Sequence, residues 1–588
     1  MTLNLHLTQL EISGLIQLAQ EYPELEYLFR HALMQDAAYG SLLMSDRKKM
    51  HSKVAQVLEN LFAGKLDEVA AVLAHHWELA ERPQKALYYF VQAGDAAAKV
   101  YANDEAVEHY GRSLTLAQQT PIDSGTLVHL CTALGRVLEI QSLYHEALAH
   151  YQTMSQLAEQ LDDKALTLAA LMGRTTLHVT ATPVHDLNWG ESLAQQAIAL
   201  AQELGDEPIQ TKLLWNMINF YQFSNRLDQA IATGERALVL VQKQPAMETE
   251  AYIRNDLAMC YNRLGRLQDS LHMAEQAGVL WRQLDNLPML IDSLAQASIA
   301  HYYRGDYAQS IAVSDEGFQL GQAIGNPQAQ AYVRVTAGLA YWKTGVIRDV
   351  LAGYRGTIQF AKQANFVPVL VYAHANLAFV LIGIGAFSEA LMEAQTAQTL
   401  AQNQFPHALP YANTILALVQ LNQGDLATVE TTIGQIKVDP IYIPSPGFQP
   451  LVELAEAMWL ADNGRYAQAL AVIQTNQKST HNREFIGFHP DYLLLKGQIL
   501  SAMNQQEAAY TALQEAHALA QTHNNRQLLW QILAEEAALL KSLNKLEMAQ
   551  SLYEEARQIL SNIIADIPDN YRDSFRKLAA VTAVLQTS

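Results

Sequence analysis

An all-α solenoid of stacked helix pairs is the fold class that this sequence predicts, and three observations predict it. A turn-forming residue recurs at steps of 40 residues, with one step of 39. Small residues keep fixed distances from that turn, and the segments between turns are rich in Ala, Leu, Gln and Glu, which favour helix. A fixed period of this size indicates supersecondary units that stack on one another. The turn positions are Asn225, Gly265, Gly305, Gly345, Gly385, Gly424, Gly464, Asn504 and Asn544.

Each unit contains the parts of two helices that meet at the turn. Gly or Asn at the turn tolerates the left-handed backbone that ends a helix. A larger apolar residue two places later is expected to fill the space beside the turn, as in Leu227, Leu267 and Tyr307. Small residues let the two backbones approach closely. They stand seven places before the turn, as in Ala258, Ser298, Gly338 and Ala378, and five places after it, as in Ala230, Ser270, Ser310 and Ala390.

These offsets resemble the tetratricopeptide repeat, whose unit is a helix pair of about 34 residues. A period of 40 residues implies the same pair with longer helices, as in the maltose-regulon activator type of that family. The resemblance covers residues 205–560, and residues 85–205 with less regular spacing. It implies a right-handed superhelix of about eleven to thirteen helix pairs.

Four segments are expected along the chain. Residues 1–60 lack the period and are interpreted as amphipathic helices, a winged-helix remnant or helical linker. Residues 61–205 are irregular repeats, residues 206–562 are the regular 40-residue repeats, and residues 563–588 form a C-terminal cap or tail.

The front and the tail also resemble a specific family. The matching stretches are Phe29-Arg30-His31-Ala32-Leu33 with Tyr39 and Leu42-Leu43, Leu73-Ala74-His75-His76 continuing to Ala93-Gly94, and the tail from Ala565 to Phe575. They resemble the segment between the ATPase core and the repeats in bacterial STAND-type signalling ATPases, many of them fused to class III adenylate cyclases or protein kinases. The resemblance implies a sensor and oligomerisation arm. The chain has no G-x-x-x-x-G-K-[ST] phosphate-binding loop, so nucleotide chemistry is not carried over.

Composition narrows the class of partner and the compartment. The net charge of −20 argues against a broad nucleic-acid-binding face, and the basic triplet at residues 47–49 is interpreted as a solvated helix end. Cys131 and Cys260 are too far apart in a solenoid to pair, which fits a reducing cytoplasm. The start shows no secretory pattern, and the apolar stretch from Leu377 to Phe387 is too short to span a bilayer.

Three motifs suggest chemistry but lack the required spacing. Adjacent His75 and His76 would point about 100° apart on a helix, which disfavours binding of one metal ion. His145 and His150 are five places apart, whereas a zinc-protease helix needs four. Gly383-Ile384-Gly385 lacks the third glycine and the preceding strand of a dinucleotide loop. We therefore expect no catalytic residue, no cofactor and no metal, and the sequence predicts a binding protein that is not an enzyme.

The candidate binding residues lie on the first helix of each pair, which lines the concave side in tetratricopeptide solenoids. The exposed positions are expected two, three, six, ten and thirteen places before each turn. Aromatic residues combined with Asn and Arg are typical of protein or peptide recognition. The alternative, that these aromatics pack against neighbouring repeats, stays open. The residues are Trp215, Asn219, Tyr252, Asn255, Asn262, Arg263, Tyr302, Tyr303, Tyr332, Trp342, Lys343, Tyr372 and Phe379.

Two segments interrupt the pattern. Residues 437–450 contain four prolines, and residues 476–490 end in Phe485, Phe488 and Pro490, so both are predicted to cut short the second helix of their unit. They are either tolerated loop variation or loops that cap the groove.

The sequence thus predicts a protein- or peptide-binding scaffold or sensor of a bacterial signalling system. A small effector is an alternative ligand, and self-association stays open. A second interpretation is the C-terminal regulatory fragment of a STAND ATPase or of an adenylate or guanylate cyclase. A third, a DNA-linked regulator, is disfavoured by the acidic balance.

Overall fold

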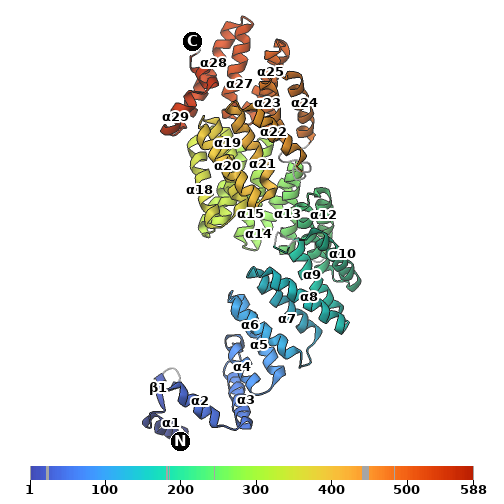
Figure 1. Ribbon diagram of the computed structural model, residues 1–588, viewed down its shortest axis with the longest axis vertical. Helices are drawn as coiled ribbons and strands as arrows, with labels where there is room; N and C mark the ends of the chain where they lie inside the picture. Colours follow the sequence, from blue (N-terminus) through green and yellow to red (C-terminus); the bar gives the residue numbers. More distant parts are fainter. Residues whose placement is uncertain are drawn as a thin grey trace. The chain divides into compact units, whose positions relative to one another are not determined.

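The chain folds into two compact units, Met1–Gly205 and Asp206–Ser588 (Figure 1). The computed structural model describes residues 2–20, 26–179, 183–184, 186–243, 246–439, 449–482 and 484–586. Helices dominate both units, and one short β-hairpin near the N-terminus accounts for the strands among the described residues. The all-α prediction is therefore confirmed.

Unit 1 begins with the hairpin region and continues as sequential helix pairs. Its elements are α1 (Thr2–Ile12), β1 (Ile16–Gln20), β2 (Glu26–Phe29), α2 (Ala32–Ser41), α3 (Met44–Leu61), η1 (Leu66–Val69), α4 (Ala70–Leu79), α5 (Pro83–Lys99), α6 (Asn103–Ala117), α7 (Ser124–Ile140), α8 (Tyr144–Leu161), α9 (Lys164–Val179) and α10 (Leu187–Leu204).

The hairpin corrects the sequence prediction for the first 60 residues. That stretch was interpreted as amphipathic helices, a winged-helix remnant or helical linker, and no strand was predicted, but β1 and β2 pair antiparallel, with Ile16 opposite Phe29. Both strands are only four or five residues long, and in so short an apolar run the helical and strand patterns are hard to distinguish. The antiparallel pairing between the two segments makes them strands and not helices.

Unit 2 consists of helix pairs followed by two short terminal helices. Its elements are α11 (Glu207–Phe223), α12 (Leu227–Lys243), α13 (Met247–Leu264), α14 (Leu267–Gln283), α15 (Leu287–Arg304), α16 (Tyr307–Ala323), α17 (Pro327–Thr344), α18 (Ile347–Gln363), α19 (Val367–Gly383), α20 (Phe387–Gln404), η2 (Pro406–Ala408), α21 (Leu409–Asn422), α22 (Leu426–Val438), α23 (Gln449–Asp462), α24 (Tyr466–Asn482), η3 (Ile486–Phe488), α25 (His489–Ala502), α26 (Gln506–Thr522), α27 (Arg526–Ser542), α28 (Leu546–Asp566), α29 (Asp569–Arg576) and α30 (Ala579–Gln586). The boundary predicted between residues 562 and 563 falls inside α28.

The predicted turns are all present and all left-handed. Each of the nine turn residues has a positive φ, from 60° at Asn225 to 83° at Gly345. The helix that follows starts two places later, at Leu227, Leu267 or Tyr307 in the first three units, and these side chains are buried. A period of punctuating residues is therefore enough to place the helix boundaries in this unit.

The small residues beside the turns pack as predicted. Ala258 is fully buried, and the hydroxyl of Ser270, five places after the turn, donates to the Ala258 carbonyl at 2.8 Å. One unit later the Ser310 hydroxyl repeats this contact and donates to the Ser298 carbonyl at 2.9 Å. At Gly338 an added Cβ would overlap the ring of Tyr354, so the absence of a side chain allows that aromatic to fill the core.

The odd-numbered helices form the inner layer of unit 2. From α11 to α21 each contacts the next odd-numbered helix, and no comparable contact joins successive even-numbered helices within the described part of the chain. Helices that approach each other from repeat to repeat line the concave side of a superhelix. The inner face is therefore made by the first helix of each pair.

Unit 2 also packs later helices against earlier turns, along a contact that we call the seam. Helix α17 contacts α27, α18 contacts α28, and α15 contacts η3. The backbone N–H of Gln268 donates to Glu484, 216 residues away, a little more than five 40-residue periods. Tyr571 in α29 donates to Glu389 at 2.6 Å. The solenoid thus coils far enough for its C-terminal helices to reach its earlier repeats.

The two irregular segments behave differently from each other. Helix α22 ends at Val438, so the second helix of that unit is short, as predicted, while residues 440–448 lie outside the described part. Helix α24 keeps 17 residues, from Tyr466 to Asn482, so the prediction that it is cut short is wrong. The one proline of residues 476–490, Pro490, comes after the helix, in the first turn of α25, where it leaves no hydrogen bond unmade.

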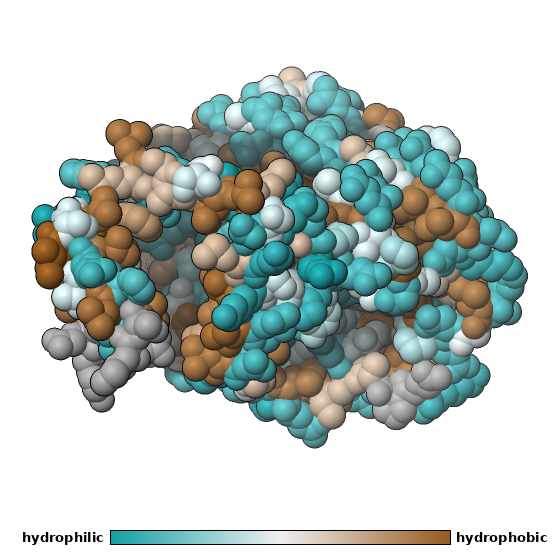
Figure 2. Space-filling model, turned by 90° about the horizontal axis from the view of Figure 1, so that it is seen from below, coloured by the Kyte–Doolittle hydropathy of each residue, from teal (hydrophilic) through white to brown (hydrophobic). Residues whose placement is uncertain are grey.

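The surface is mixed in character. Figure 2 shows hydrophobic residues scattered among hydrophilic ones on the face viewed from below. Many of the exposed large hydrophobic residues occur in the first 61 residues, among them Leu3, Ile12, Leu33, Leu43 and Met44. Of the helices in the described residues, none combines the length and the apolar character that a bilayer crossing requires.

Candidate binding face

Eight of the thirteen candidate residues are partly exposed on the odd-numbered helices. Trp215 and Tyr252 stack with their ring centroids 4.8 Å apart, which joins α11 to α13. Tyr372 lies 5.5 Å from Tyr411 of the next repeat, and Tyr332 lies 6.1 Å from Phe366. These rings form a row from repeat to repeat. The partly exposed candidates are Trp215, Asn219, Tyr252, Arg263, Tyr303, Tyr332, Tyr372 and Phe379.

The exposure predicted for the other five candidates is wrong. Asn255, Asn262, Tyr302, Trp342 and Lys343 are buried. Asn255 and Asn262 bond to the next repeat: Asn262 donates to the Gln296 backbone carbonyl at 3.0 Å, and Asn255 donates to the carboxylate of Asp292. Both alternatives left open by the sequence therefore occur, with some residues exposed on the inner face and others packed between repeats.

The seam explains why positions close to the turns are buried. Lys343 forms an ion pair with Asp491, at 2.8 and 2.9 Å to its two carboxylate oxygens, and Tyr303 packs edge-on against Phe485 at 5.1 Å. The Tyr307 hydroxyl donates to the backbone carbonyl of Gly487. Residues 484–491 therefore cover the turns of α13–α14 and α15–α16 and the end of α17.

Two carboxylates lie among the inner aromatic side chains, and the sequence analysis missed both. Asp256 accepts hydrogen bonds from Trp215 Nε1 at 2.6 Å and from Asn219 Nδ2 at 3.1 Å. Burial raises the pKa of Asp256 to about 7, with a further contribution from the negative charge of Asp292. Burial likewise raises the pKa of Asp292 to about 6, opposed by hydrogen bonds from Asn255 and Tyr332. Asp292 and Tyr411 stand thirteen places before their turns, the position that the aromatic candidates Tyr252, Tyr332 and Tyr372 occupy before theirs. Inspection of that position in every unit would therefore have found Asp292 and Tyr411.

Side chains three repeats apart on the inner face influence each other electrostatically. The positive charge of Arg263 lowers the pKa of Tyr372, three repeats later, against the stronger effect of burial, which raises it. Arg263 itself donates to the Gln222 carbonyl at 2.7 Å and to Asn225 at 3.0 Å.

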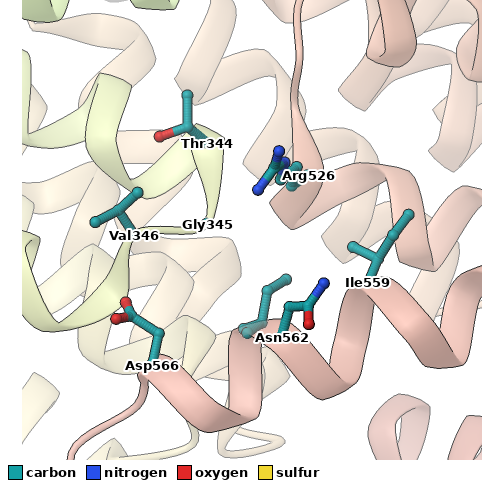
Figure 3. A pocket seen from close by; sticks show the side chains of 8 residues that line it. Thr344, Gly345, Val346, Arg526, Ile559, Asn562 and Asp566 are labelled. Atoms are coloured by element: carbon teal, nitrogen blue, oxygen red, sulfur yellow. The ribbon is translucent and has the colours of Figure 1, made fainter.

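A separate cavity of about 390 Å³ lies at the seam, away from this face. Figure 3 shows the turn from Thr344 to Val346 on one side, with Arg526, Asn562 and Asp566 from α27 and α28 on the other. Asp566 also accepts the backbone N–H of Arg348 at 3.0 Å. The cavity is part of the packing between earlier and later repeats.

The motifs weighed for chemistry have structural partners. His76 Nδ1 lies 2.8 Å from Nδ1 of His51, and His150 bonds to the Cys131 carbonyl at 2.7 Å. Gly385 is a repeat turn with φ of 74°. Within the described ranges no three His, Cys, Asp or Glu side chains come together in a way that could hold a metal ion.

The helix pairs, the left-handed turns and the buried small residues define a tetratricopeptide-like repeat solenoid. No protein-family model matches the chain. No curated protein matches it either.

Solved structures with similar architecture are distant. The APC/C hetero-tetramer Cut9–Hcn1 is 13% identical, with a TM-score of 0.48, over 93% of this chain and 99% of that chain. A Rap protein complexed with competence and sporulation factor is 11% identical, with a TM-score of 0.40, over 82% and 99%. A STAND protein with a tetratricopeptide repeat sensor from Pyrococcus horikoshii is 14% identical, with a TM-score of 0.36, over 64% and 58%. Similarities at this level do not define a function for this chain.

Proposed function

We propose that the chain is a protein- or peptide-binding scaffold or sensor whose ligand lies along the inner face of unit 2. The observation that carries the proposal is the row of partly exposed aromatic side chains on successive odd-numbered helices, with polar groups between them. Aromatic rings supply contact area and the polar groups supply directed hydrogen bonds, the combination that dominates recognition interfaces. The repeats hold these side chains in a fixed row, which lowers the entropic cost of binding.

A selection of peptides from a random dodecapeptide display library, with the full chain as bait, tests the proposal. Selected peptides should bind the intact chain and lose about tenfold or more in affinity to the variants Tyr332→Ala and Tyr372→Ala. Tyr510→Ala, which removes a half-buried ring from the outer helix α26, is the matched control and should bind normally. Thermal melting followed by circular dichroism establishes that each variant is folded.

Two results would contradict the proposal. The first is a failure to select any peptide that binds the intact chain. The second is a set of peptides that bind all three folded variants as tightly as the original.

The signalling context and the cytoplasmic location belong to the same proposal. The resemblance of the front of the chain and of its tail to STAND-type signalling ATPases supports a bacterial signalling role. Cys131 and Cys260 are buried free thiols, which fits a reducing compartment.

A second candidate function is the regulatory part of a larger ATPase or cyclase. One observation favours it: among the described residues up to 61, Ile16 and Ala55 are the buried hydrophobic residues, and large apolar side chains such as Leu33 are exposed. Such residues are expected to pack against another module. An immunoblot of the native source with an antibody against residues 563–588 separates the two candidates. A band well above 65.3 kDa supports the regulatory part, and a band at that mass supports the free-standing scaffold.

A further inference from the structure

One position of the inner face departs from its neighbours. Thirteen places before the five turns from Gly265 to Gly424 stand Tyr252, Asp292, Tyr332, Tyr372 and Tyr411, which we call the tyrosine column; the remaining four turns carry Lys212, Leu451, Asp491 and Gln531 at this offset. Asp292 takes the place of a tyrosine between Tyr252 on α13 and Tyr332 on α17. A carboxylate therefore replaces a phenol at a position where the neighbouring repeats carry an aromatic ring.

A second carboxylate lies on the adjacent helix. Asn255, the residue before Asp256, donates to the Asp292 carboxylate and accepts from the Ser293 hydroxyl, which places the two carboxylates on facing turns of α13 and α15. Both are partly exposed on the inner face. The groups that bond to them are neutral donors, namely Trp215 and Asn219 for Asp256, and Asn255 and Tyr332 for Asp292.

No basic side chain balances this pair of charges. In the described part of the chain neither Asp256 nor Asp292 forms an ion pair with Lys, Arg or His. Arg263, on the same helix as Asp256, donates instead to Gln222 and Asn225. Burial raises the pKa of both carboxyl groups, and a cation bound between them would favour their ionised forms.

A third acceptor, linked to Asp292 through Gln296 and Tyr332, also lacks a donor. Asn262 is buried, and its Oδ1 accepts no hydrogen bond among the described residues. Its Nδ2 donates to Gln296, whose amide in turn donates to the Tyr332 hydroxyl at 2.7 Å. The region therefore offers acceptors in excess of donors, which is complementary to a group that carries several N–H donors and a positive charge.

We propose that Asp256 and Asp292 bind a Lys or Arg side chain of a peptide that lies along the inner face, with the rings of Trp215, Tyr252 and Tyr332 around it. This inference rests on the proposed function and names the chemistry of its ligand. Aromatic rings attract a cation that is close to their faces, so they add to the attraction of the carboxylates. The tyrosine column continues to Tyr372 and Tyr411 beyond the carboxylates, which provides contact area for a longer chain. The net charge of −20 favours the approach of a basic partner.

The experiment uses the peptides selected on the full chain. Their sequences should be enriched in Lys or Arg at one position. In fluorescence polarisation, a selected peptide in which citrulline replaces that Arg, or acetyl-lysine replaces that Lys, should bind about tenfold or more weakly. The variants Asp292→Asn and Asp256→Asn should weaken binding of the basic peptide by a similar factor and leave binding of the neutral peptide unchanged.

Two further variants secure the interpretation. Asp292→Tyr restores the residue that the column carries elsewhere, so it removes the carboxylate in a side chain that this position accommodates in other repeats. Asp228→Asn makes the same charge change on the exposed outer helix α12 and should leave affinity unaltered. Melting temperatures of all variants establish that they are folded.

The outcomes separate this inference from the proposed function. Peptides that bind the inner face without a basic residue, and equally well to the Asp variants, would overturn the inference and leave the proposed function intact. If spermidine binds in a way that depends on both carboxylates and no peptide is selected, the ligand is a small polyamine and the proposal of a peptide ligand is wrong. A chain that binds neither peptide nor spermidine would overturn both proposals.

Discussion

The ion pair between Lys343 and Asp491 allows the seam to be tested quantitatively. The two residues are 148 positions apart, their side chains are 8% and 16% exposed, and the Lys343 ammonium bonds to both carboxylate oxygens of Asp491. Substitution Asp491→Ala leaves a buried ammonium without its partner. Breaking a buried pair from one side costs about 3–5 kcal/mol. At the lower bound, local opening of the seam becomes roughly 100-fold more frequent.

Native-state hydrogen exchange read by mass spectrometry measures that opening directly. Peptides that cover residues 484–502 and the end of α17 should exchange faster in Asp491→Ala. Peptides from unit 1 should be unchanged, because each repeat depends mainly on its neighbours.

A double variant supplies the control for this experiment. Lys343→Met combined with Asp491→Leu replaces the pair by apolar side chains of similar size, which is often neutral or stabilising. It should return exchange at the seam close to the original rate. If Asp491→Ala exchanges at the original rate in residues 484–502, the ion pair does not hold the seam and the reasoning fails.

Three other predictions concern the repeats themselves. Ala258→Leu overpacks a fully buried contact between paired helices and should cost about 1–3 kcal/mol, measured by urea unfolding; no loss would contradict the packing register. Gly424→Ala places a Cβ at a φ of 81° with no atom nearby, so it should cost about 1–2 kcal/mol of backbone strain. Gly305→Ala has the same backbone strain, and its Cβ would also overlap His523. The Gly305→Ala protein should therefore melt at a lower temperature than the Gly424→Ala protein. The pKa of Asp256, about 7 when folded, lies above its unfolded value, so the folded state binds more protons and loses stability as pH rises from about 4 to about 7. Asp256→Asn should flatten that decline in melting temperature, and an identical pH profile for both proteins would refute the assignment.

The repeat architecture could be predicted because its signals are local. A Gly or Asn that must adopt a positive φ ends a helix whatever surrounds it, so Gly265 or Asn504 marks a boundary from sequence alone. Small residues such as Ala258 stand at fixed offsets from that turn, since the two helices it joins are neighbours in sequence and in space. The pairing of β1 with β2, the full length of α24 and the end of α28 at Asp566 were not predicted by these local signals.

The candidate site was predicted only in part. The helix face was correct for Trp215, Tyr252 and Tyr332, which are partly exposed on the inner layer. Burial of Lys343 could not be foreseen, because it depends on an ion pair with Asp491, 148 residues away along the chain. Asp292 was overlooked although its position in the column is visible in the sequence.

The sequence by itself determined the helix pairs, their turns and the residues that let paired helices approach, because these depend on backbone preference and on contacts within one 40-residue period. Only the tertiary structure decided which inner residues stay exposed, because exposure depends on how far the superhelix coils before later helices meet earlier turns. Contacts across 148 to 218 residues set that geometry, and no local pattern encodes them. The pair Asp256 and Asp292, which has no basic partner, is recognised only when the sequence position of Asp292 is combined with the contacts in the folded structure.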